Sequence, residues 1–158
     1  MKLIFPGSFD PFTKGHASVV RRGLEFCDEM VIAVGYNPLK TNATMFTADE
    51  RIRQISEFYK NEPRISVVSY TTLTADFARK LQCTHILRGV RTVIDFEYER
   101  QLADVNRHLS GIETILLFNE PNMAYINSTT VRELLSFGKD VSDFMPEGFP
   151  ELKLNKKN

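Results

Sequence analysis

Two patterns of apolar and polar positions alternate along the chain. Short apolar runs rich in Val and Ile are typical of strands buried on both faces of a sheet. Longer stretches in which apolar residues recur every three or four positions are typical of amphipathic helices. The expected strands are Lys2–Phe5, Met30–Tyr36, Ile65–Ser69, His85–Leu87 and Thr114–Phe118. The expected helices are His16–Phe26, Ala48–Tyr59, Ala75–Lys80, Val93–Leu109, Val131–Phe137 and Val141–Phe144.

The order of these elements, a strand and then a helix, favours βαβ units and a parallel sheet. Because crossovers between parallel strands are right-handed, we expect a Rossmann-like α/β fold. It would have a doubly wound, five-stranded parallel sheet and C-terminal helices. The 158 residues suit a single domain. We place this domain at residues 1–152 and a polar tail at residues 153–158.

Composition and charge exclude several classes of protein. Twenty basic residues balance twenty acidic ones, so the chain has no basic field to attract nucleic acid or an anionic membrane. Cys27 and Cys83 lack CxxC spacing and suit reduced thiols, and neither His85 nor His108 has metal-ligand spacing. No signal-peptide pattern or long apolar run is present. We expect a cytoplasmic protein with no metal held by its own side chains.

The loop from Phe5 to His16 joins the first expected strand to the first expected helix. Gly7 lets the backbone turn or approach a ligand closely, and Gly15 leaves open space beside His16. The start of a helix offers unpaired N–H groups and positive potential, which suit a phosphate. The loop therefore predicts phosphate binding without a Walker A or GxGxxG motif. The alternative is a plain turn followed by a histidine that begins a helix.

Other segments reach the same edge of the sheet, where ligands bind beyond the carboxyl ends of the strands. These are Pro38–Lys40, Arg88–Arg91 and Ala124–Thr130. The two arginines can hold planar oxyanions by bidentate hydrogen bonds. Their alternative role is to pair with one of the nearby carboxylates, which are Asp95, Glu97 and Glu99.

The segment after Asn127 begins another expected helix. Thr130 and Glu133 have the spacing of a capping box. Ser128 and Thr129 would then be spare hydroxyls that could bind a phosphate, although simple capping is the alternative.

The longest expected helix carries an apolar stripe that is either core or a subunit interface. The stripe is formed by Ile94, Tyr98, Leu102, Val105 and Leu109. Glu99 and Asn106 lie two turns apart on a neighbouring stripe, where the pattern alone favours a solvated face or pairing within the helix.

Taken together, the motifs resemble those of the bacterial phosphopantetheine adenylyltransferases, a family of the nucleotidylyltransferase superfamily. Thr13–His16 matches the (H/T)xGH signature of that superfamily, and the resemblance covers about residues 2–150. The blocks that carry it are Pro6–Pro11, Gly15–His16, Arg88–Arg91, Asp95–Glu99, Asn106–Leu109 and Ser128–Arg132.

The resemblance implies transfer of AMP from ATP to the 4′-phosphate of phosphopantetheine, with Mg²⁺. The products are pyrophosphate and dephospho-coenzyme A, in the penultimate step of coenzyme A biosynthesis. It also implies a homohexamer and coenzyme A as an inhibitor. The alternatives are another nucleotidylyltransferase, of the nicotinate-mononucleotide or CDP-alcohol type, or a non-catalytic nucleotide-binding module.

The resemblance also assigns residues to roles. Catalysis falls to Ser8, His16, Lys40 and Arg91, with His16 stabilising the transition state of a direct in-line attack. Phosphopantetheine would contact Ser8, Lys40, Leu73, Thr74, Arg88 and Asn106. The nucleotide would contact Ser8, Phe9, His16, Gly89, Val90, Arg91, Glu99, Ala124, Tyr125, Ile126, Asn127, Ser128, Thr129 and Thr130. The chain departs from the family pattern at Ser8, Ala124, Asn127 and the loop Thr41–Thr44.

Overall fold

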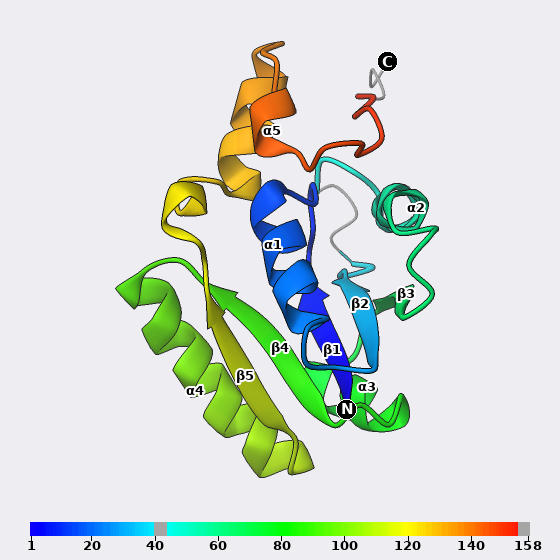
Figure 1. The fold of residues 1–158 in the computed structure, drawn as a ribbon, viewed down its shortest axis with the longest axis vertical. Helices are drawn as coiled ribbons and strands as arrows, with labels where there is room; N and C mark the ends of the chain where they lie inside the picture. The colour runs from blue at the N-terminus through cyan, green and yellow to red at the C-terminus, as the bar shows by residue number, and fades with distance from the viewer. Residues whose placement is uncertain (40–43, 155–158) are drawn as a thin grey trace.

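The computed structural model describes residues 1–39 and 44–154. The strands are β1 (Lys2–Gly7), β2 (Glu29–Gly35), β3 (Ile65–Tyr70), β4 (His85–Val90) and β5 (Glu113–Phe118). The helices are α1 (Lys14–Gly23), α2 (Ala48–Phe58), α3 (Thr74–Lys80), α4 (Val93–Ser110) and α5 (Ser128–Ser136), with 3₁₀ turns η1 (Pro121–Met123) and η2 (Ser142–Phe144). All five strands are parallel and lie in the order β3-β2-β1-β4-β5 (Figure 1). The predicted doubly wound sheet is therefore confirmed.

β1 and β4 lie at the centre of the sheet but pair over only a short length. Leu3–Ile4 face His85–Ile86, whereas β1 pairs with β2 as far as Gly7. The carboxyl ends of β1 and β4 therefore diverge. The order of the strands also reverses between β1 and β4, and such a switch point is where open α/β sheets bind their ligands.

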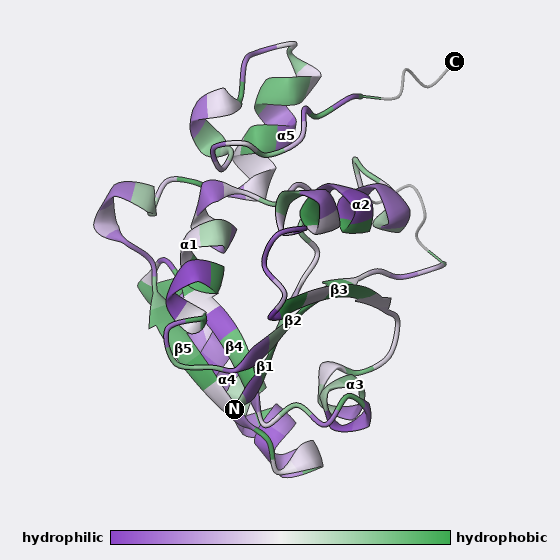
Figure 2. Cartoon of the chain, turned by 45° about the vertical axis from the view of Figure 1, so that its right-hand side comes forward, coloured by the Kyte–Doolittle hydropathy of each residue, from purple (hydrophilic) through white to green (hydrophobic). Residues whose placement is uncertain are grey.

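Helices cover both faces of the sheet. α2 and α3 lie on opposite faces (Figure 2). Ile55 of α2 belongs to one core cluster and Ala78 of α3 belongs to the other. No helix in the described ranges is long and apolar enough to cross a membrane.

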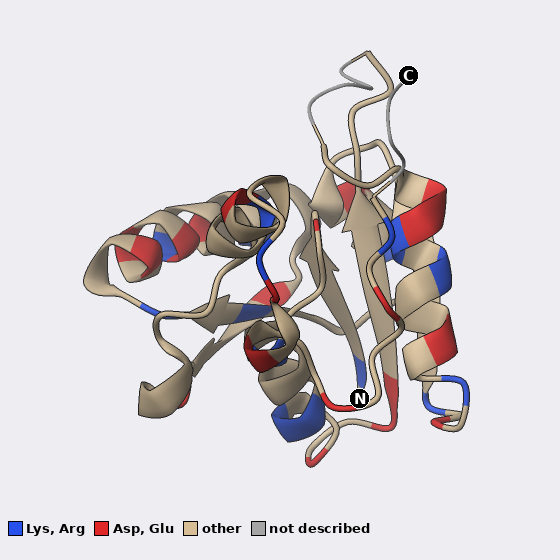
Figure 3. Ribbon diagram, turned by 90° about the horizontal axis from the view of Figure 1, so that it is seen from above, with Lys and Arg blue, Asp and Glu red and all other residues tan. Residues whose placement is uncertain are grey.

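Charged side chains of both signs are distributed over the helices. Figure 3 shows Lys and Arg near Asp and Glu along the same helices. Since the net charge is zero, positive potential at a ligand site must come from local groups.

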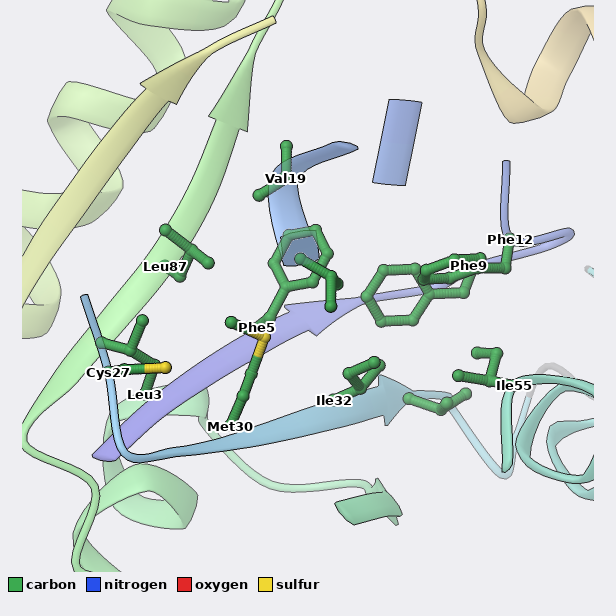
Figure 4. Close-up of a cluster of buried hydrophobic side chains, with 12 residues drawn as sticks. Leu3, Phe5, Phe9, Phe12, Val19, Cys27, Met30, Ile32, Ile55 and Leu87 are labelled. Carbon is green, nitrogen blue, oxygen red and sulfur yellow. The ribbon is translucent and has the colours of Figure 1, made fainter. Parts of the chain in front are cut away.

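The core anchors the loop that follows β1. Leu3 and Phe5 point into the larger core cluster, and Ile4, between them, points into the smaller one. Phe9 and Phe12 of the loop also enter the larger cluster (Figure 4), and their ring centroids are 5.5 Å apart. Because both rings are fully buried, the polar residues around them are held in fixed positions.

The end of β4 differs from the prediction. The strand continues to Val90, so Arg88 and Gly89 lie within it instead of after it. Pairing with β5 explains the extension, because the register runs from His85 to Val90 without interruption.

The start of α5 also differs. Asn127 is the N-cap, and its side-chain oxygen accepts the N–H of Thr130 at 2.8 Å. The helix therefore begins at Ser128, and the capping box predicted for Thr130 and Glu133 is wrong. The helix predicted at Val141–Phe144 is the single 3₁₀ turn η2.

The apolar stripe of α4 is not core within this chain. Ile94 is 83% exposed, and Tyr98, Val105 and Leu109 are also exposed. Glu99 is instead the only buried residue of α4 and pairs with Arg88 of β4, so neither the solvated face nor the pairing within the helix that its spacing suggested holds for this residue.

Candidate active site

A cavity of about 540 Å³ opens where β1 and β4 diverge. It is lined by the loop after β1, the start of α1, the end of β4 and the segment that leads into α5. Of the residues predicted to contact a nucleotide, those that line it are Ser8, Phe9, His16, Gly89, Arg91, Glu99, Ala124, Ile126, Asn127, Ser128 and Thr129. Val90, Tyr125 and Thr130 do not line it; Val90 is buried in β4, and Tyr125 is exposed and packs on Phe144.

A second cavity, of about 450 Å³, lies between the sheet and helices α3 and α4. It is lined by the described residues predicted to contact phosphopantetheine, which are Ser8, Leu73, Thr74, Arg88 and Asn106. The remaining member of that set, Lys40, lies outside the described residues.

The two cavities share one wall. Pro6, Gly7, Ser8, Arg88 and Glu99 line both of them. Two compartments with a common wall suit a reaction that joins two substrates end to end, because the reacting groups can meet at the wall.

His16 is held by the loop that precedes it. It is the third residue of α1, and its Nδ1 accepts the backbone N–H of the N-cap, Thr13, at 3.0 Å. Its ring packs against Phe9 and Phe12, with centroids 5.0 Å and 5.4 Å away. Burial, and then the charges of Arg91 and Arg88, lower the pKa of His16 to about 3. The ring is therefore neutral, and since Nδ1 is an acceptor, Nε2 carries the proton.

Arg88 forms a bidentate ion pair with the buried Glu99. Its Nε and Nη2 donate to the two carboxylate oxygens at 2.7 Å and 2.6 Å. Its Nη1 donates to the carbonyl of Pro6, so the guanidinium bridges the gap between β4 and β1. Burial opposes the charge of Arg88, but the hydrogen bonds and charge of Glu99 outweigh it and raise the pKa of Arg88.

Arg91 pairs with Asp95 at 3.1 Å on a more exposed part of the wall. The alternative raised for both arginines, pairing with nearby carboxylates, is thus present in the structure. Such pairs also fix the direction of a guanidinium, which is compatible with holding an oxyanion at the nitrogens that remain. Glu97 pairs with Arg100 instead.

The start of α5 presents a second set of anion-binding groups. The hydroxyl of Ser128 donates to the carbonyl of Pro11 at 2.8 Å, and that of Thr129 accepts from Arg132 at 3.2 Å. These hydroxyls are therefore engaged, unlike the spare hydroxyls that we predicted. The first N–H groups of α5 and the guanidinium of Arg132 are the groups that suit a phosphate here.

Two further residues in the loop network were missed by the sequence reasoning. The carboxylate of Asp10 accepts the N–H groups of Met45 and Phe46, both at 2.8 Å. Arg132 donates to the carbonyl of Asp10 at 2.7 Å. The position of Arg132 three residues after Thr129, at the start of a helix, was a signal that could have identified it.

Arg51 is a buried arginine of α2 that no sequence pattern indicated. Its Nε donates to the carbonyls of Phe46 and Thr47 at 3.1 Å and 3.2 Å. Its Nη1 donates to the carbonyl of Ser8. Arg51 therefore joins the loop after β1 to the start of α2, and it fixes the backbone beside both cavities.

The carboxylates of the first cavity do not form a metal site. Asp95 and Glu99 are each engaged by an arginine. Residues 1–39 and 44–154 contain no group of three or more His, Cys, Asp or Glu side chains that could hold a metal ion. A Mg²⁺ ion that acts here would suit coordination by the phosphates of a bound nucleotide, which is the usual way Mg²⁺ enters such sites.

Comparisons with known proteins found a matching family model and similar proteins. Residues 4–134 match the family model described as Cytidylyltransferase-like. The phosphopantetheine adenylyltransferase of Bacteroides fragilis is 56% identical over 147 residues, which are 93% of this chain and 97% of that protein. The phosphopantetheine adenylyltransferase of Bacteroides thetaiotaomicron is 55% identical over 147 residues, which are 93% and 96% of the two chains.

The same fold occurs in a solved structure. A bifunctional NMN adenylyltransferase/ADP ribose pyrophosphatase from Francisella tularensis matches with a TM-score of 0.67 and 17% identity. The match covers 91% of this chain and 44% of that protein. At this identity the likeness concerns the fold alone.

Proposed function

The chain belongs to the phosphopantetheine adenylyltransferase family of nucleotidyltransferases, and we propose that it transfers AMP from ATP to the 4′-phosphate of phosphopantetheine. One observation carries this proposal: two cavities meet at Ser8 and Arg88, and the neutral imidazole of His16 lies in the wall of the first. The products are pyrophosphate and dephospho-coenzyme A.

ATP occupies the first cavity in this proposal. The helix starts at Lys14 and Ser128 place N–H groups and positive potential there. Arg91 and Arg132 add charge for the triphosphate. Mg²⁺ held by the phosphates of ATP would supply positive charge to neutralise the leaving pyrophosphate.

The reaction needs no general base. A phosphate monoester has a second pKa of about 6, so the acceptor is largely a dianion at neutral pH. One of its oxygens attacks the α-phosphorus in line; a P–O bond forms as the bond to the bridging oxygen of pyrophosphate breaks. The protein works by positioning and by charge stabilisation.

His16 stabilises the charge that develops on the α-phosphate. Its Nε2–H is a hydrogen-bond donor that neither gains nor loses a proton during the reaction. Ser8 lies in the wall between the cavities and contacts the same phosphate. Lys40 and Arg88 hold the acceptor phosphate, and the role of Lys40 rests on the family resemblance.

Phosphopantetheine occupies the second cavity. Its phosphate lies at Arg88, and its arm extends along Leu73, Thr74 and Asn106. Coenzyme A contains the same arm and an adenosine group, so it fits both cavities and acts as an inhibitor. We expect the protein to be cytoplasmic, because the proposed reaction is a step of coenzyme A biosynthesis.

The active form is a homohexamer. The exposed apolar side chains of α4 support it, since Val93 and Ile94 are 79% and 83% exposed. The neighbouring Phe118, at the end of β5, is also exposed. Contact with another copy of the chain would bury this surface, and the molar mass in solution, measured by light scattering, tests it.

Pyrophosphate release from ATP and Mg²⁺ tests the function, measured with and without 4′-phosphopantetheine and with the product identified by mass. We expect release that depends on the acceptor and formation of dephospho-coenzyme A. Release with nicotinate mononucleotide instead, or use of CTP with an alcohol phosphate, would identify another nucleotidylyltransferase. ATP binding without turnover of any acceptor would identify a non-catalytic module.

A further inference from the structure

Asn119 is the first residue after β5, and it lines the first cavity. None of the roles implied by the family resemblance falls on it. Within residues 1–39 and 44–154, no other group hydrogen-bonds its side-chain amide. An asparagine side chain offers two N–H donors and a carbonyl acceptor. The donors and the acceptor of Asn119 are therefore available to a ligand in this cavity.

The backbone around Asn119 is held by the neighbouring strand and by α1. The N–H of Asn119 donates to the carbonyl of Val90 at 2.8 Å, which continues the pairing of β5 with β4 by one residue. The carbonyl of Phe118, the preceding residue, accepts Nη1 of Arg22 at 2.5 Å. Both bonds fix the direction in which the chain leaves the sheet.

Glu120, the following residue, is clamped to α1 as well. Its Oε1 accepts the hydroxyl of Ser18 at 2.8 Å and Nη2 of Arg21 at 2.6 Å. The residues on either side of Asn119 are thus anchored to one helix, while its own side chain has no bond within the described chain. A group held this way is preorganised, so a ligand that binds it pays little for ordering the loop.

The wall beside the amide is neutral. The position that a Cβ would take on Gly15 is 3.4 Å from Nδ2 of Asn119, and the corresponding position on Gly89 is 3.3 Å from Oδ1. The same position on Gly89 is 2.9 Å from Cγ2 of Val19. All four residues line the first cavity. Because the two glycines have no side chains, the backbones of α1 and β4 leave room for a ligand close to the amide.

The charged groups of this cavity lie on other residues. Arg91, Arg132 and the first N–H groups of α5 are the groups that suit the triphosphate. ATP has one strongly charged part and one flat, uncharged part, which is the adenine base. The neutral wall formed by Gly15, Val19, Gly89 and Asn119 suits the base.

Adenine is also chemically complementary to an amide. Its exocyclic amine is a donor, and the ring nitrogens on either side of that amine are acceptors. An asparagine amide presents an acceptor beside a donor, so it can form two hydrogen bonds with this edge at once. Asparagine reads adenine in DNA by the same pairing.

We propose that the side-chain amide of Asn119 hydrogen-bonds the exocyclic amine of adenine and an adjacent ring nitrogen, and thereby selects nucleotides that carry this amine. This inference rests on the proposed function, because it names a specificity residue of the same nucleotide site. Asn119 touches the base and not the reacting phosphates. It therefore acts on the affinity for ATP and has no part in the chemical step.

The test is a comparison of two nucleotides with three proteins. The nucleotides are ATP and the triphosphate of purine riboside, which lacks the amine. The proteins are the wild type, Asn119→Leu, which keeps the size of the side chain without its polar atoms, and Asn119→Ala. Calorimetry with Mg²⁺ and without acceptor gives the Kd of each pair.

We expect the wild type to bind ATP more tightly than the nucleotide without the amine. In both variants this preference, the ratio of the two Kd values, should fall about three- to tenfold, the effect of losing one net hydrogen bond. The melting temperatures should stay unchanged, because no hydrogen bond within the described chain is lost.

Asn122→Leu is the matched control. Asn122 lies in η1, three residues further along, is exposed and lines neither cavity. It should keep the wild-type preference for the amine.

Two results would overturn the inference. One is a wild type that transfers AMP from ATP but binds both nucleotides equally well. The other is a preference that stays at the wild-type value in Asn119→Leu and Asn119→Ala, even if both nucleotides bind more weakly, since that would indicate a packing role. These results leave the proposed function intact, whereas a wild-type protein that binds ATP but transfers AMP to no acceptor would contradict the proposed function and could still show the preference.

Discussion

The backbone N–H of Thr13 donates to Nδ1 of His16 at 3.0 Å, and this single bond has two effects. It satisfies a backbone donor at the start of α1, in the manner of a capping box with a histidine in place of the usual Glu or Gln. It also leaves the ring proton on Nε2. The bond that begins the helix thus orients the side chain that we place at the α-phosphate.

Replacing His16 with alanine should lower kcat much more than the affinity for ATP. A donor that acts on developing charge is worth about 10²–10³ in kcat, whereas its bond to the ground state is weaker. Steady-state kinetics and ATP titration measure the two effects. His108→Ala, on an exposed position of α4, is the control. Equal losses in kcat and ATP affinity would contradict the assignment.

The pH dependence of stability should report the partly buried ring of His16. Its pKa is about 3 in the folded protein and about 6.5 in an unfolded chain. Between these values the unfolded state binds more protons, so the free energy of unfolding falls as the pH is lowered from 6.5 towards 3. We expect about 1–2 kcal/mol of this loss between pH 7 and pH 5 to come from His16.

Urea denaturation of the wild type and of His16→Ala at both pH values measures that contribution. The wild type should lose more stability on acidification than the variant does. Identical losses would mean that the ring titrates near its ordinary pKa in the folded state.

Arg88→Ala should raise the KM for phosphopantetheine more than the KM for ATP. The guanidinium lies at the wall between the cavities, and its removal also leaves the buried carboxylate of Glu99 unpaired. Breaking a buried pair costs about 3–5 kcal/mol, so the melting temperature should fall as well.

Arg100→Ala is the matched control, because Arg100 pairs with Glu97 in an exposed ion pair. It should change both KM values little. If Arg88→Ala weakened only ATP binding, the roles of Arg88 and Arg91 would have to be exchanged.

Asn127→Ala should destabilise the protein by about 1 kcal/mol, because it removes the N-cap of α5. Asn127→Ser should be nearly neutral because serine is also a good N-cap. Thermal unfolding compares the variants. Equal stability of Asn127→Ala and the wild type would show that another group caps the helix.

Spacing along the chain was sufficient to predict the five strands and the loop after β1, although α1 begins at Lys14 and not at His16 as predicted. These features depend on neighbours: apolar runs favour buried strands, and a glycine beside a histidine at a helix start favours a phosphate loop. The same local reasoning failed at Asn127. Its side chain competes with that of Thr130 for one cap, and short spacing rules do not decide between two good caps.

Contacts between distant residues were decided by the tertiary structure. The sequence by itself determined the order of the elements, the presence of two arginines beside a glycine, and the motifs that resemble a family. It did not determine that Arg88 would bridge Pro6 and Glu99, that Arg51 would hold the carbonyl of Ser8, or that Asn119 would line a cavity. Those relationships arise because β4 lies beside β1 and diverges from it, and strand order depends on how the whole chain packs and not on any local spacing.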